Sequence, residues 1–377
     1  MKILVLNYEF PPVGGGGGAA AERICAWLTA QGHEVRVETS LVRGLPQVET
    51  RDGYTIHRRF AGRRRADRCS VWEMALYLMT TFWPTWRHTR AWRPDVIHVH
   101  FAVPTGVLAW LIHKLTGIPY LLTVHLGDVP GALPQQTDRL FRVLKPLTIP
   151  IWKRAAAITA VSDFVRGLAE KAYGTEVKTV YNAIDLPSAS TPKQFSEGPV
   201  RLLFAGRFNP QKNLLFLINV LEELVDLEWT LDLAGNGPQE KALRSAVTEA
   251  GLDSRVTFHG WVEPREVNAL MESCHILCMP SLSEGLPVVA VQALAHGMVI
   301  VGSEIGGLRD VVRGDNGFLI PLNDLSGFRA CLRTLISDQA LLARLGENSK
   351  KLAEDFDLDK VGRAYEALLE VIQVKNG

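Results

Sequence analysis

The sequence predicts an α/β protein made of two Rossmann-like domains, each built on a parallel sheet. Two segments begin alike: β-rich runs at 2–8 and 200–207 each lead through a loop into a helix pattern and a second strand, which is a βαβ unit. Most later strand candidates are almost continuously apolar, as in parallel strands buried on both faces. At 377 residues the chain is also too long for one ordinary core. We expect the two sheets to face each other across a cleft, where ligands collect at the carboxyl ends of the strands.

The remaining elements follow from the periodicity of apolar residues along the chain. Helical spacing predicts helices at 21–32, 214–225 and 358–373. Short apolar runs predict further strands at 33–39, 95–101, 120–125, 156–162, 177–182, 229–235, 255–260, 275–281 and 298–303.

A segment rich in Pro and Ser, 186–199, has no apolar periodicity and predicts an interdomain linker. We therefore expect an N-terminal Rossmann-like domain over 1–187 and a C-terminal one over 188–356. The last piece, 357–377, is expected to form a helix that packs back toward the N-terminal domain.

Charge and cysteine content restrict the class of protein. Residues 1–190 carry 23 Lys and Arg against 15 Asp and Glu, whereas the rest of the chain carries 18 against 25. The first half can therefore face an anionic surface or acceptor, although uneven sampling of solvated faces explains the counts equally well. No recognition motif accompanies the basic residues, so we expect no nucleic-acid partner. The five scattered cysteines predict reduced thiols rather than a zinc site.

The start of the chain has the pattern of a strand and not of a secretory signal. The longest apolar run falls well short of a membrane span. A cytoplasmic protein is therefore expected.

Five glycines at 14–18 lie between the first strand and the helix that follows it. Bare backbone at a helix N-terminus lets N–H groups approach an anion closely, while a flexible loop is the ordinary alternative. The run is not a G-x-G-x-x-G motif followed by an acidic residue after the second strand, so it supports a dinucleotide site only weakly.

Three polar side chains follow other strands at their carboxyl ends. Arg207 and Lys212 lie five residues apart across a turn, so their cationic heads can converge on one diphosphate. His125 ends the strand at 120–125, just before Gly and Asp, and this position favours a role at a reacting centre. The alternative for Arg207 and Lys212 is that they are solvated surface residues, and the alternative for His125 is a structural role.

The stretch SEGLPVVAVQALAHG places a carboxylate at the start of a helix and an amide two turns inside it. Gly285, Leu286 and Pro287 are expected to begin this helix, where free amides and the helix dipole bind phosphate oxygens. Glu284 cannot bind the same phosphate, so we expect it to accept hydrogen bonds from sugar hydroxyls. Gln292, eight residues on, lies deeper and nearer a nucleoside. The ordinary alternative for Glu284 is a charge at a helix N-terminus, and the ordinary alternative for Gln292 is a solvated helix residue.

Short motifs run through the whole chain in order: PPVGG (11–15), GHEV (32–35), PDVIHVH (94–100), HLGD (125–128), VS (161–162), YNAID (181–185), GR and KN within 206–213, LAGNGP (233–238), FHG (258–260), PSLSEGLPVVAVQALAHG (280–297) and VGSEIGGLRDVV (301–312). This series resembles the retaining glycosyltransferases of the GT-B fold, in particular glycosyltransferase family 4 (glycosyl transferases group 1). The resemblance implies an N-terminal domain that binds the acceptor and a C-terminal domain that binds a nucleotide sugar.

The resemblance also implies a role for each matching position. Gly15 and Gly16 lie near the donor phosphates and the acceptor entrance, and His125 lies beside the transferred sugar. Arg207 and Lys212 neutralise the diphosphate. The other positions hold the donor: Glu284 its sugar hydroxyls, the amides of Gly285, Leu286 and Pro287 a phosphate, residue 292 the ribose, and the backbone at Trp261 and Val262 the base.

The expected reaction moves a sugar from a UDP- or GDP-sugar to a hydroxyl, with no metal ion and no other cofactor. Arg207, Lys212 and a helix N-terminus would stabilise the departing diphosphate, and the sequence shows no Asp-x-Asp metal motif. The acceptor is expected to be a glycan, a lipid-linked glycan or a small molecule, as in bacterial cell-surface polysaccharide synthesis.

The family pattern has Glu at both ends of the eight-residue spacing, and this chain departs from it at Gln292. An amide offers one acceptor where a carboxylate offers two, so we expect weaker ribose binding. Two alternatives stay open: a nucleotide-sugar-binding protein with impaired catalysis, and a nucleotide-sugar epimerase on the same fold.

Basic and Trp-rich segments at 58–68 and 83–93 flank an amphipathic run at 71–83. Such a region can lie on an anionic membrane, at its inner face, and present a lipid-linked acceptor. The alternative is that a helix just before 94–100 packs on the sheet, which would explain its apolar residues.

Overall fold

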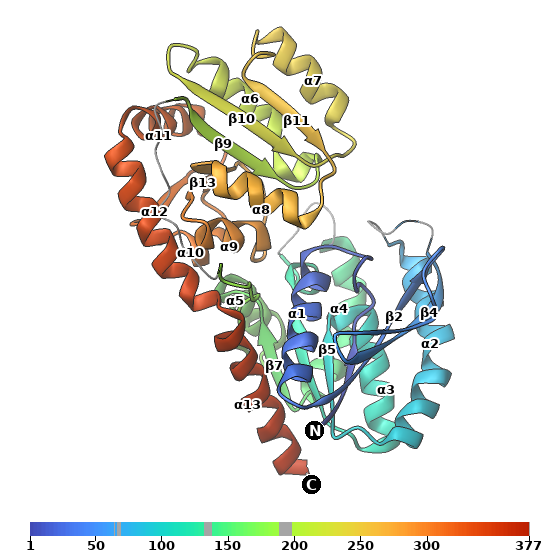
Figure 1. The fold of residues 1–377 in the computed structure, drawn as a ribbon. Helices are drawn as coiled ribbons and strands as arrows, with labels where there is room; N and C mark the ends of the chain where they lie inside the picture. The colour runs from blue at the N-terminus through green and yellow to red at the C-terminus, as the bar shows by residue number, and fades with distance from the viewer. Residues whose placement is uncertain (64, 66–68, 132–137, 188–197, 377) are drawn as a thin grey trace. The chain divides into compact units, whose positions relative to one another are not determined.

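The computed structural model describes residues 1–63, 65, 69–131, 138–187 and 198–376. It divides into two compact units, which are described separately (Figure 1). The N-terminal unit comprises Met1–Ile184 with Asp357–Gly377, and the C-terminal unit comprises Asp185–Phe356. Most of the expected linker, 188–197, lies outside the described residues.

The N-terminal unit contains a mostly parallel sheet with strand order β3-β4-β2-β1-β5-β6-β7-β8 in its described part. Only the β3–β4 pair is antiparallel among these neighbours. The strands are β1 (Lys2–Leu6), β2 (Glu34–Val42), β3 (Val48–Arg51), β4 (Tyr54–Arg63), β5 (Val96–His100), β6 (Tyr120–Val124), β7 (Ala157–Ala160) and β8 (Lys178–Thr179).

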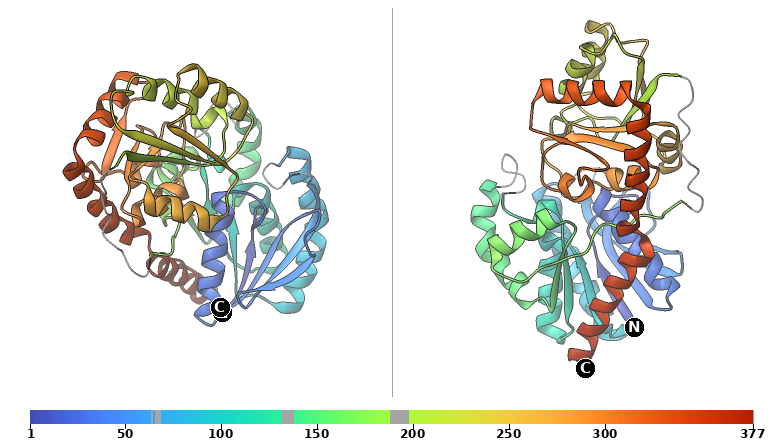
Figure 2. Two further views of the ribbon diagram at one scale, coloured as in Figure 1. Left: turned by 45° about the horizontal axis from the view of Figure 1, so that its top comes forward. Right: turned by 90° about the vertical axis from the view of Figure 1, so that its left-hand side faces the viewer.

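The helices of this unit are α1 (Gly16–Ala30), α2 (Val71–Trp92), α3 (Val107–Thr116), α4 (Asp138–Arg154), α5 (Asp163–Tyr173) and α13 (Leu358–Asn376), with the short turns η1 (Ala102–Gly106) and η2 (Leu126–Asp128). Helix α13 contacts α1, β5 and β6 and runs along the N-terminal sheet (Figure 2). Trp27 Nε1 donates to Asp359 Oδ1 at 2.7 Å, and His33 Nε2 lies 2.7 Å from Glu366 Oε1. The end of the chain therefore completes the N-terminal unit.

The C-terminal unit contains a second sheet with strand order β11-β10-β9-β12-β13-β14, in which all described pairs are parallel. The strands are β9 (Val200–Ala205), β10 (Trp229–Ala234), β11 (Val256–Gly260), β12 (Ile276–Met279), β13 (Val299–Ser303) and β14 (Gly317–Ile320). The helices are α6 (Leu214–Glu222), α7 (Glu240–Glu249), α8 (Pro264–Ser273), α9 (Val288–Ala295), α10 (Leu308–Val311), α11 (Leu325–Ser337) and α12 (Gln339–Ala353), with the turns η3 (Pro210–Lys212) and η4 (Glu354–Phe356).

The prediction of two parallel-sheet α/β domains is confirmed. Every residue of the central strands β5, β6, β12 and β13 is buried, which explains why these runs are rich in apolar residues. Each expected strand is present, although 177–182 contributes only the two residues of β8. The five cysteines are free thiols. Among the described residues, no helix is both long and apolar enough to span a bilayer.

Two local expectations were wrong. Helix α1 begins at Gly16, five residues earlier than its apolar periodicity indicated, so most of the glycine run is helical rather than loop. Strand β4 was missed because its Arg residues were interpreted as part of a surface patch. Arg58 and Arg63 are in fact buried: Arg58 pairs with Glu49 at 2.7 Å, and Arg63 donates to Tyr8 O at 3.2 Å. The partner of Arg58 arrives on β3, which the sequence pattern did not reveal.

Candidate active site

In the C-terminal unit, three loops meet at the carboxyl ends of β9, β12 and β13, which are neighbours in the sheet. Gln211 joins the first two of these loops: its Nε2 donates to Ser283 O, and its backbone O accepts from Leu282 N, both at 2.8 Å. The sequence analysis did not single out Gln211, because its partners lie more than 70 positions further along the chain.

The same pair of loops brings together two predicted site residues. Lys212 Nζ donates to Glu284 Oε1 at 2.5 Å, and Glu284 is buried. Asn209 fixes the turn that carries Lys212, because its Oδ1 accepts from Lys212 N at 3.2 Å. A cation and a carboxylate from distant parts of the chain therefore form one charge-assisted contact at the sheet edge.

The third loop locks the position of Glu284 through the backbone. Gly307 N donates to Glu284 O at 3.1 Å. A Cβ atom at position 307 would lie 1.5 Å from Gly285 O, so only glycine allows this approach. The two loops are consequently held against each other with little freedom to shift.

Helix α9 starts at Val288, just after the residues 285–287 that were expected to begin it. Pro287 is its N-cap with φ −72° and ψ 114°, and Val288 is the first helical residue. Proline has no N–H group, so amides for an anion come from Gly285, Leu286 and the first turn of α9. Gln292 lies half-buried in the second turn.

The other predicted donor residues lie on neighbouring loops. Arg207 is half-buried just after β9. Trp261 is exposed and Val262 half-buried directly after β11, the edge strand, two strands away from β9. The described hydrogen bonds join Lys212 to Glu284 and connect neither to Trp261 or Val262.

In the N-terminal unit, His125 follows β6 and is buried. Its ring stacks on Phe101 with centroids 4.3 Å apart. A Cβ atom at Gly17 would lie 3.1 Å from the His125 ring, so the glycine run lets the first turn of α1 pack directly on it. Gly15 is the N-cap of α1 and Gly16 its first helical residue, and the structure thus places the glycine run beside His125.

The buried histidines of this unit are neutral. His125 Nε2 lies 3.4 Å from His100 Nδ1. Burial lowers the pKa of His125 to about 4. Burial, with the nearby His125, lowers the pKa of His98 to about 3, and the pKa of His100 falls well below its usual value for the same reason. At neutral pH these rings act as hydrogen-bonding groups without charge.

Asp128 positions the backbone around His125. Its two oxygens accept from His125 N and Ala102 N, each at 2.8 Å. Burial raises the pKa of Asp128 to about 7, although these backbone hydrogen bonds oppose the shift. The motif HLGD contains this residue three positions after His125, so the capping spacing was a signal available in the sequence.

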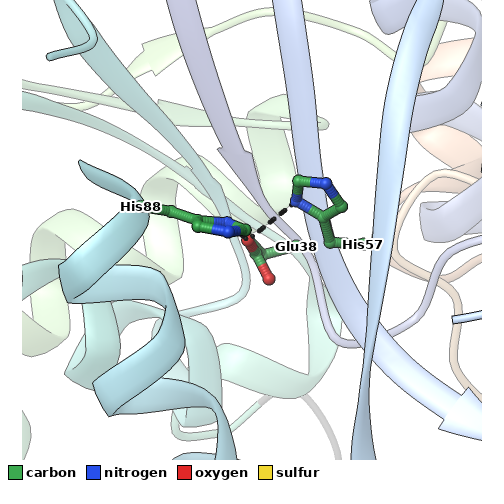
Figure 3. A group of neighbouring side chains, drawn as sticks. All are labelled: Glu38, His57 and His88. Carbon is green, nitrogen blue, oxygen red and sulfur yellow. Dashed lines mark hydrogen bonds and ion pairs between the residues drawn. The ribbon is translucent and has the colours of Figure 1, made fainter. Parts of the chain in front are cut away.

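Figure 3 shows Glu38 of β2, His57 of β4 and His88 of α2 turned toward one another. Nδ1 of each histidine lies near Glu38 Oε1, at 3.1 and 3.2 Å, and the three possible metal-ligand atoms lie within 4.8 Å of one another. Arg59 also donates to both oxygens of this carboxylate, at 2.7 and 3.0 Å. A guanidinium thus already neutralises the carboxylate, and the group is an ion-paired anchor between β2, β4 and α2 rather than a prepared cation site.

The anchor keeps its carboxylate charged. Burial opposes ionisation of Glu38, but hydrogen bonds from His57, His88 and Arg59 outweigh burial and lower its pKa to about 2. Figure 3 also shows that the three side chains come from three separate elements, so their contacts hold α2 to the sheet.

Comparison with known proteins agrees with this fold. Residues 14–187 match the family model Glycosyltransferase Family 4, and residues 188–352 match the model Glycosyl transferases group 1. The protein is thus a glycosyltransferase of the GT-B type. It belongs to glycosyltransferase family 4.

Similar proteins cover nearly the whole chain. Glycogen synthase of Mycobacterium tuberculosis (strain ATCC 25618 / H37Rv) is 27% identical over 402 residues, covering 97% of this chain and 93% of its own. Sucrose-phosphate synthase from Thermosynechococcus elongatus has a TM-score of 0.85 at 20% identity and covers 100% of both chains. The Anabaena protein HepE, solved in complex with UDP and glucose, has a TM-score of 0.77 at 19% identity, covering 98% of this chain and 100% of its own.

Proposed function

We propose that this protein is a retaining glycosyltransferase that moves a sugar from a UDP- or GDP-sugar to a hydroxyl of a glycan or lipid-linked glycan. The observation that carries the proposal is the Lys212–Glu284 pair beside the start of α9, at the carboxyl edge of a parallel sheet. The UDP and glucose in the structure of the Anabaena relative support a nucleotide-sugar donor.

The ion pair is compatible with donor binding. An ammonium group has three N–H donors, so Lys212 can hold Glu284 and still donate to phosphate oxygens. Glu284 uses Oε1 for Lys212, which leaves Oε2 to accept from a sugar hydroxyl. Arg207 completes the cationic side of the diphosphate site with its planar fork.

The rest of the donor site is assigned by position along the same sheet edge. The amides of Gly285, Leu286 and the first turn of α9 bind phosphate oxygens, and Gln292 binds ribose hydroxyls. The backbone at Trp261 and Val262 binds the base. We assign the acceptor to the N-terminal unit, with Gly15 and Gly16 at its entrance.

The proposed reaction needs no protein nucleophile. The bond from the anomeric carbon to the phosphate oxygen breaks, and its electron pair leaves with the diphosphate. The acceptor oxygen bonds to the same face of the sugar, so the anomeric configuration is retained, and the acceptor proton passes to the departing phosphate. His125, being neutral, hydrogen-bonds the transferred sugar without adding charge.

We propose that the charge on the leaving group is stabilised without a metal ion. Arg207, Lys212 and the α9 dipole place positive charge where the diphosphate develops negative charge. Transfer is accordingly expected to continue at full rate in the presence of EDTA. Loss of transfer in EDTA, restored by Mg²⁺ or Mn²⁺, would contradict metal independence.

The acceptor, in this proposal, is presented at the surface of an anionic membrane. A lipid-linked glycan has its hydroxyls close to the headgroups, where a protein in peripheral contact can reach them.

One experiment tests the reaction class against its alternatives. The protein is incubated with a panel of UDP- and GDP-sugars and candidate acceptors, and the products are followed by proton NMR. We expect a new glycoside with the anomeric configuration of the donor. An inverted anomer overturns retention, an epimerised nucleotide sugar identifies an epimerase, and binding by calorimetry without any turnover identifies an impaired binding protein.

A further inference from the structure

Helix α2 buries three threonines and two aromatic residues and exposes several large apolar side chains. The residues that face the sheet recur every four positions, so they form one ridge of the helix, and three of them are threonines that are almost fully buried: Thr81, Thr85 and Thr89. On the other side, Trp72 is 85% exposed, Met79 78% and Trp83 61%. A helix on the surface of a globular protein normally has the opposite arrangement.

The inward face is held by polar contacts and by the buried rings of Tyr77 and Trp92. Tyr77 Oη donates to Glu38 O at 3.4 Å, and His88 joins the Glu38 anchor. Thr80 Oγ1 donates to Phe60 O, and Trp92 Nε1 donates to Glu34 Oε1 at 2.8 Å. Helix α2 thus packs on the sheet, as the alternative in the sequence analysis expected, but this packing does not involve the exposed tryptophans and methionine.

The exposed apolar residues lie on one face. Spacings of seven and four residues place Trp72, Met79 and Trp83 in line along the helix. Phe60 of β4 is 61% exposed, and its backbone carbonyl accepts a hydrogen bond from Thr80 of the helix. We name these four exposed side chains, Phe60, Trp72, Met79 and Trp83, the α2 surface.

Positive charge accompanies the α2 surface. Arg87 and Arg90 are exposed in the last turns of the helix, and Arg90 lies over the Trp86 ring at 5.2 Å. The one acidic residue of α2, Glu73, is engaged in the capping box with Ser70. Apolar side chains rimmed by arginines match the headgroups of an anionic bilayer, whereas a second copy of this face would bring like charges together.

The N-terminal end of α2 lies close to the acceptor side of the unit. Met74 packs on the cluster of Tyr8 and Tyr77, Tyr8 contacts Phe101 at 5.2 Å, and Phe101 stacks on His125. The start of α2 thus lies at the same edge of the unit as His125.

We propose that the α2 surface binds the surface of an anionic phospholipid bilayer, with the helix in the plane of the headgroups. Trp72 and Trp83 settle at the interface, Met79 enters the acyl boundary, and Arg87 and Arg90 bind lipid phosphates. The use of this contact to reach a lipid-linked acceptor rests on the proposed function.

Vesicle flotation of the full-length protein tests the proposal. One variant carries Trp72→Ser, Met79→Ser and Trp83→Ser, and another carries Arg87→Glu and Arg90→Glu. A matched control changes exposed apolar residues elsewhere: Leu147→Ser, Val225→Ser and Val374→Ser. The charge control is Lys241→Glu with Arg344→Glu, both exposed in the C-terminal unit.

The parent and both controls are expected to float with phosphatidylglycerol-containing vesicles and not with pure phosphatidylcholine. Each α2 variant is expected to lose about tenfold or more of this binding. Absence of parent binding, or equal binding by the serine variant, overturns the proposal. A parent dimer that the serine variant dissociates, seen by light scattering, assigns the face to a second copy and also overturns it.

Calorimetry with UDP and GDP on the same proteins separates this proposal from the proposed function. The serine substitutions change only exposed side chains, so nucleotide affinity and the circular dichroism spectrum are expected to match the parent. Nucleotide binding without vesicle binding leaves the transferase proposal standing. Vesicle binding without nucleotide binding supports the α2 proposal and contradicts the proposed glycosyltransferase function.

Discussion

The carboxyl edges of the two sheets carry opposite chemistry on a similar fold. In the C-terminal unit the edge holds an ion pair, Lys212 with Glu284, beside tightly packed backbone at Gly307. In the N-terminal unit the edge holds buried rings, Phe101 and His125, and burial keeps the histidine neutral. The first edge is organised by an ion pair, and the second by neutral rings that pack on each other.

This difference suggests a division of labour that the shared topology does not dictate. A doubly charged diphosphate is best stabilised by preorganised cations and amides, whereas a neutral hydroxyl acceptor needs a hydrogen-bonding group that stays uncharged. The fold therefore supplies the position of each edge, and a few side chains decide what each edge binds.

The largest effect is expected from removing the cations of the charged edge. Lys212→Ala and Arg207→Ala should each slow transfer by about 100-fold to 1,000-fold, because each removes charge stabilisation of the leaving group. Steady-state nucleotide release measures the change. The controls Lys241→Ala and Arg344→Ala remove exposed cations elsewhere in the same unit and should act like the parent. Unchanged release in the first two variants would show that the diphosphate lies elsewhere.

The ion-paired anchor of the N-terminal unit should affect stability and leave nucleotide binding intact. Glu38→Gln removes a buried carboxylate that three side chains contact, so the free energy of unfolding is expected to fall by about 3 kcal/mol. Urea unfolding measures the loss, and the exposed Asp52→Asn should change the value by less than about 0.5 kcal/mol. A loss of UDP or GDP affinity in Glu38→Gln would contradict the expectation that this anchor has no effect on nucleotide binding.

The fold was predictable from sequence where burial leaves a local signature. The runs at 95–101 and 120–125 are rich in apolar residues because β5 and β6 are buried on both faces. Strand β4 was not predictable in the same way, since Arg58 is buried only because Glu49 pairs with it. Periodicity alone also could not say which face of α2 packs on the sheet.

The candidate site was predictable as a set of residue types and not as a set of contacts. Strand ends and a helix start pointed to His125, Lys212 and Glu284. The direct pairing of Lys212 with Glu284 joins positions 72 apart, and no local pattern reports it. The roles of Gln211 and Asp128 likewise depend on backbone groups that become neighbours only in the folded chain.

Acidification should lower the free energy of unfolding of the N-terminal unit, because its buried histidines are neutral. The pKa of His125 is about 4 when folded against 6.5 for a free histidine, so its contribution to stability is complete above pH 6.5 and is lost as the pH falls toward 4. From about pH 7.5 to about pH 5, the expected loss in the free energy of unfolding is about 2 kcal/mol. Urea unfolding of the parent and of His125→Gln at both pH values measures it. The pH dependence should be smaller in the variant, and equal pH dependence would mean that His125 is not held neutral by burial.

The smallest effect concerns the amide in α9, where the charged edge departs from the family pattern. Gln292→Glu should tighten UDP or GDP binding by about fivefold, because a carboxylate accepts from two ribose hydroxyls and a hydrogen bond to a charged group is stronger by about 1 kcal/mol. The gain in affinity should be smaller for 2′-deoxy-UDP or 2′-deoxy-GDP, because these lack one of those hydroxyls. Calorimetry with each nucleotide and its 2′-deoxy form therefore distinguishes a ribose contact from a general effect of charge. Weaker binding in Gln292→Glu would show that the half-buried amide donates a hydrogen bond there, and that this edge tolerates no further negative charge beside Glu284.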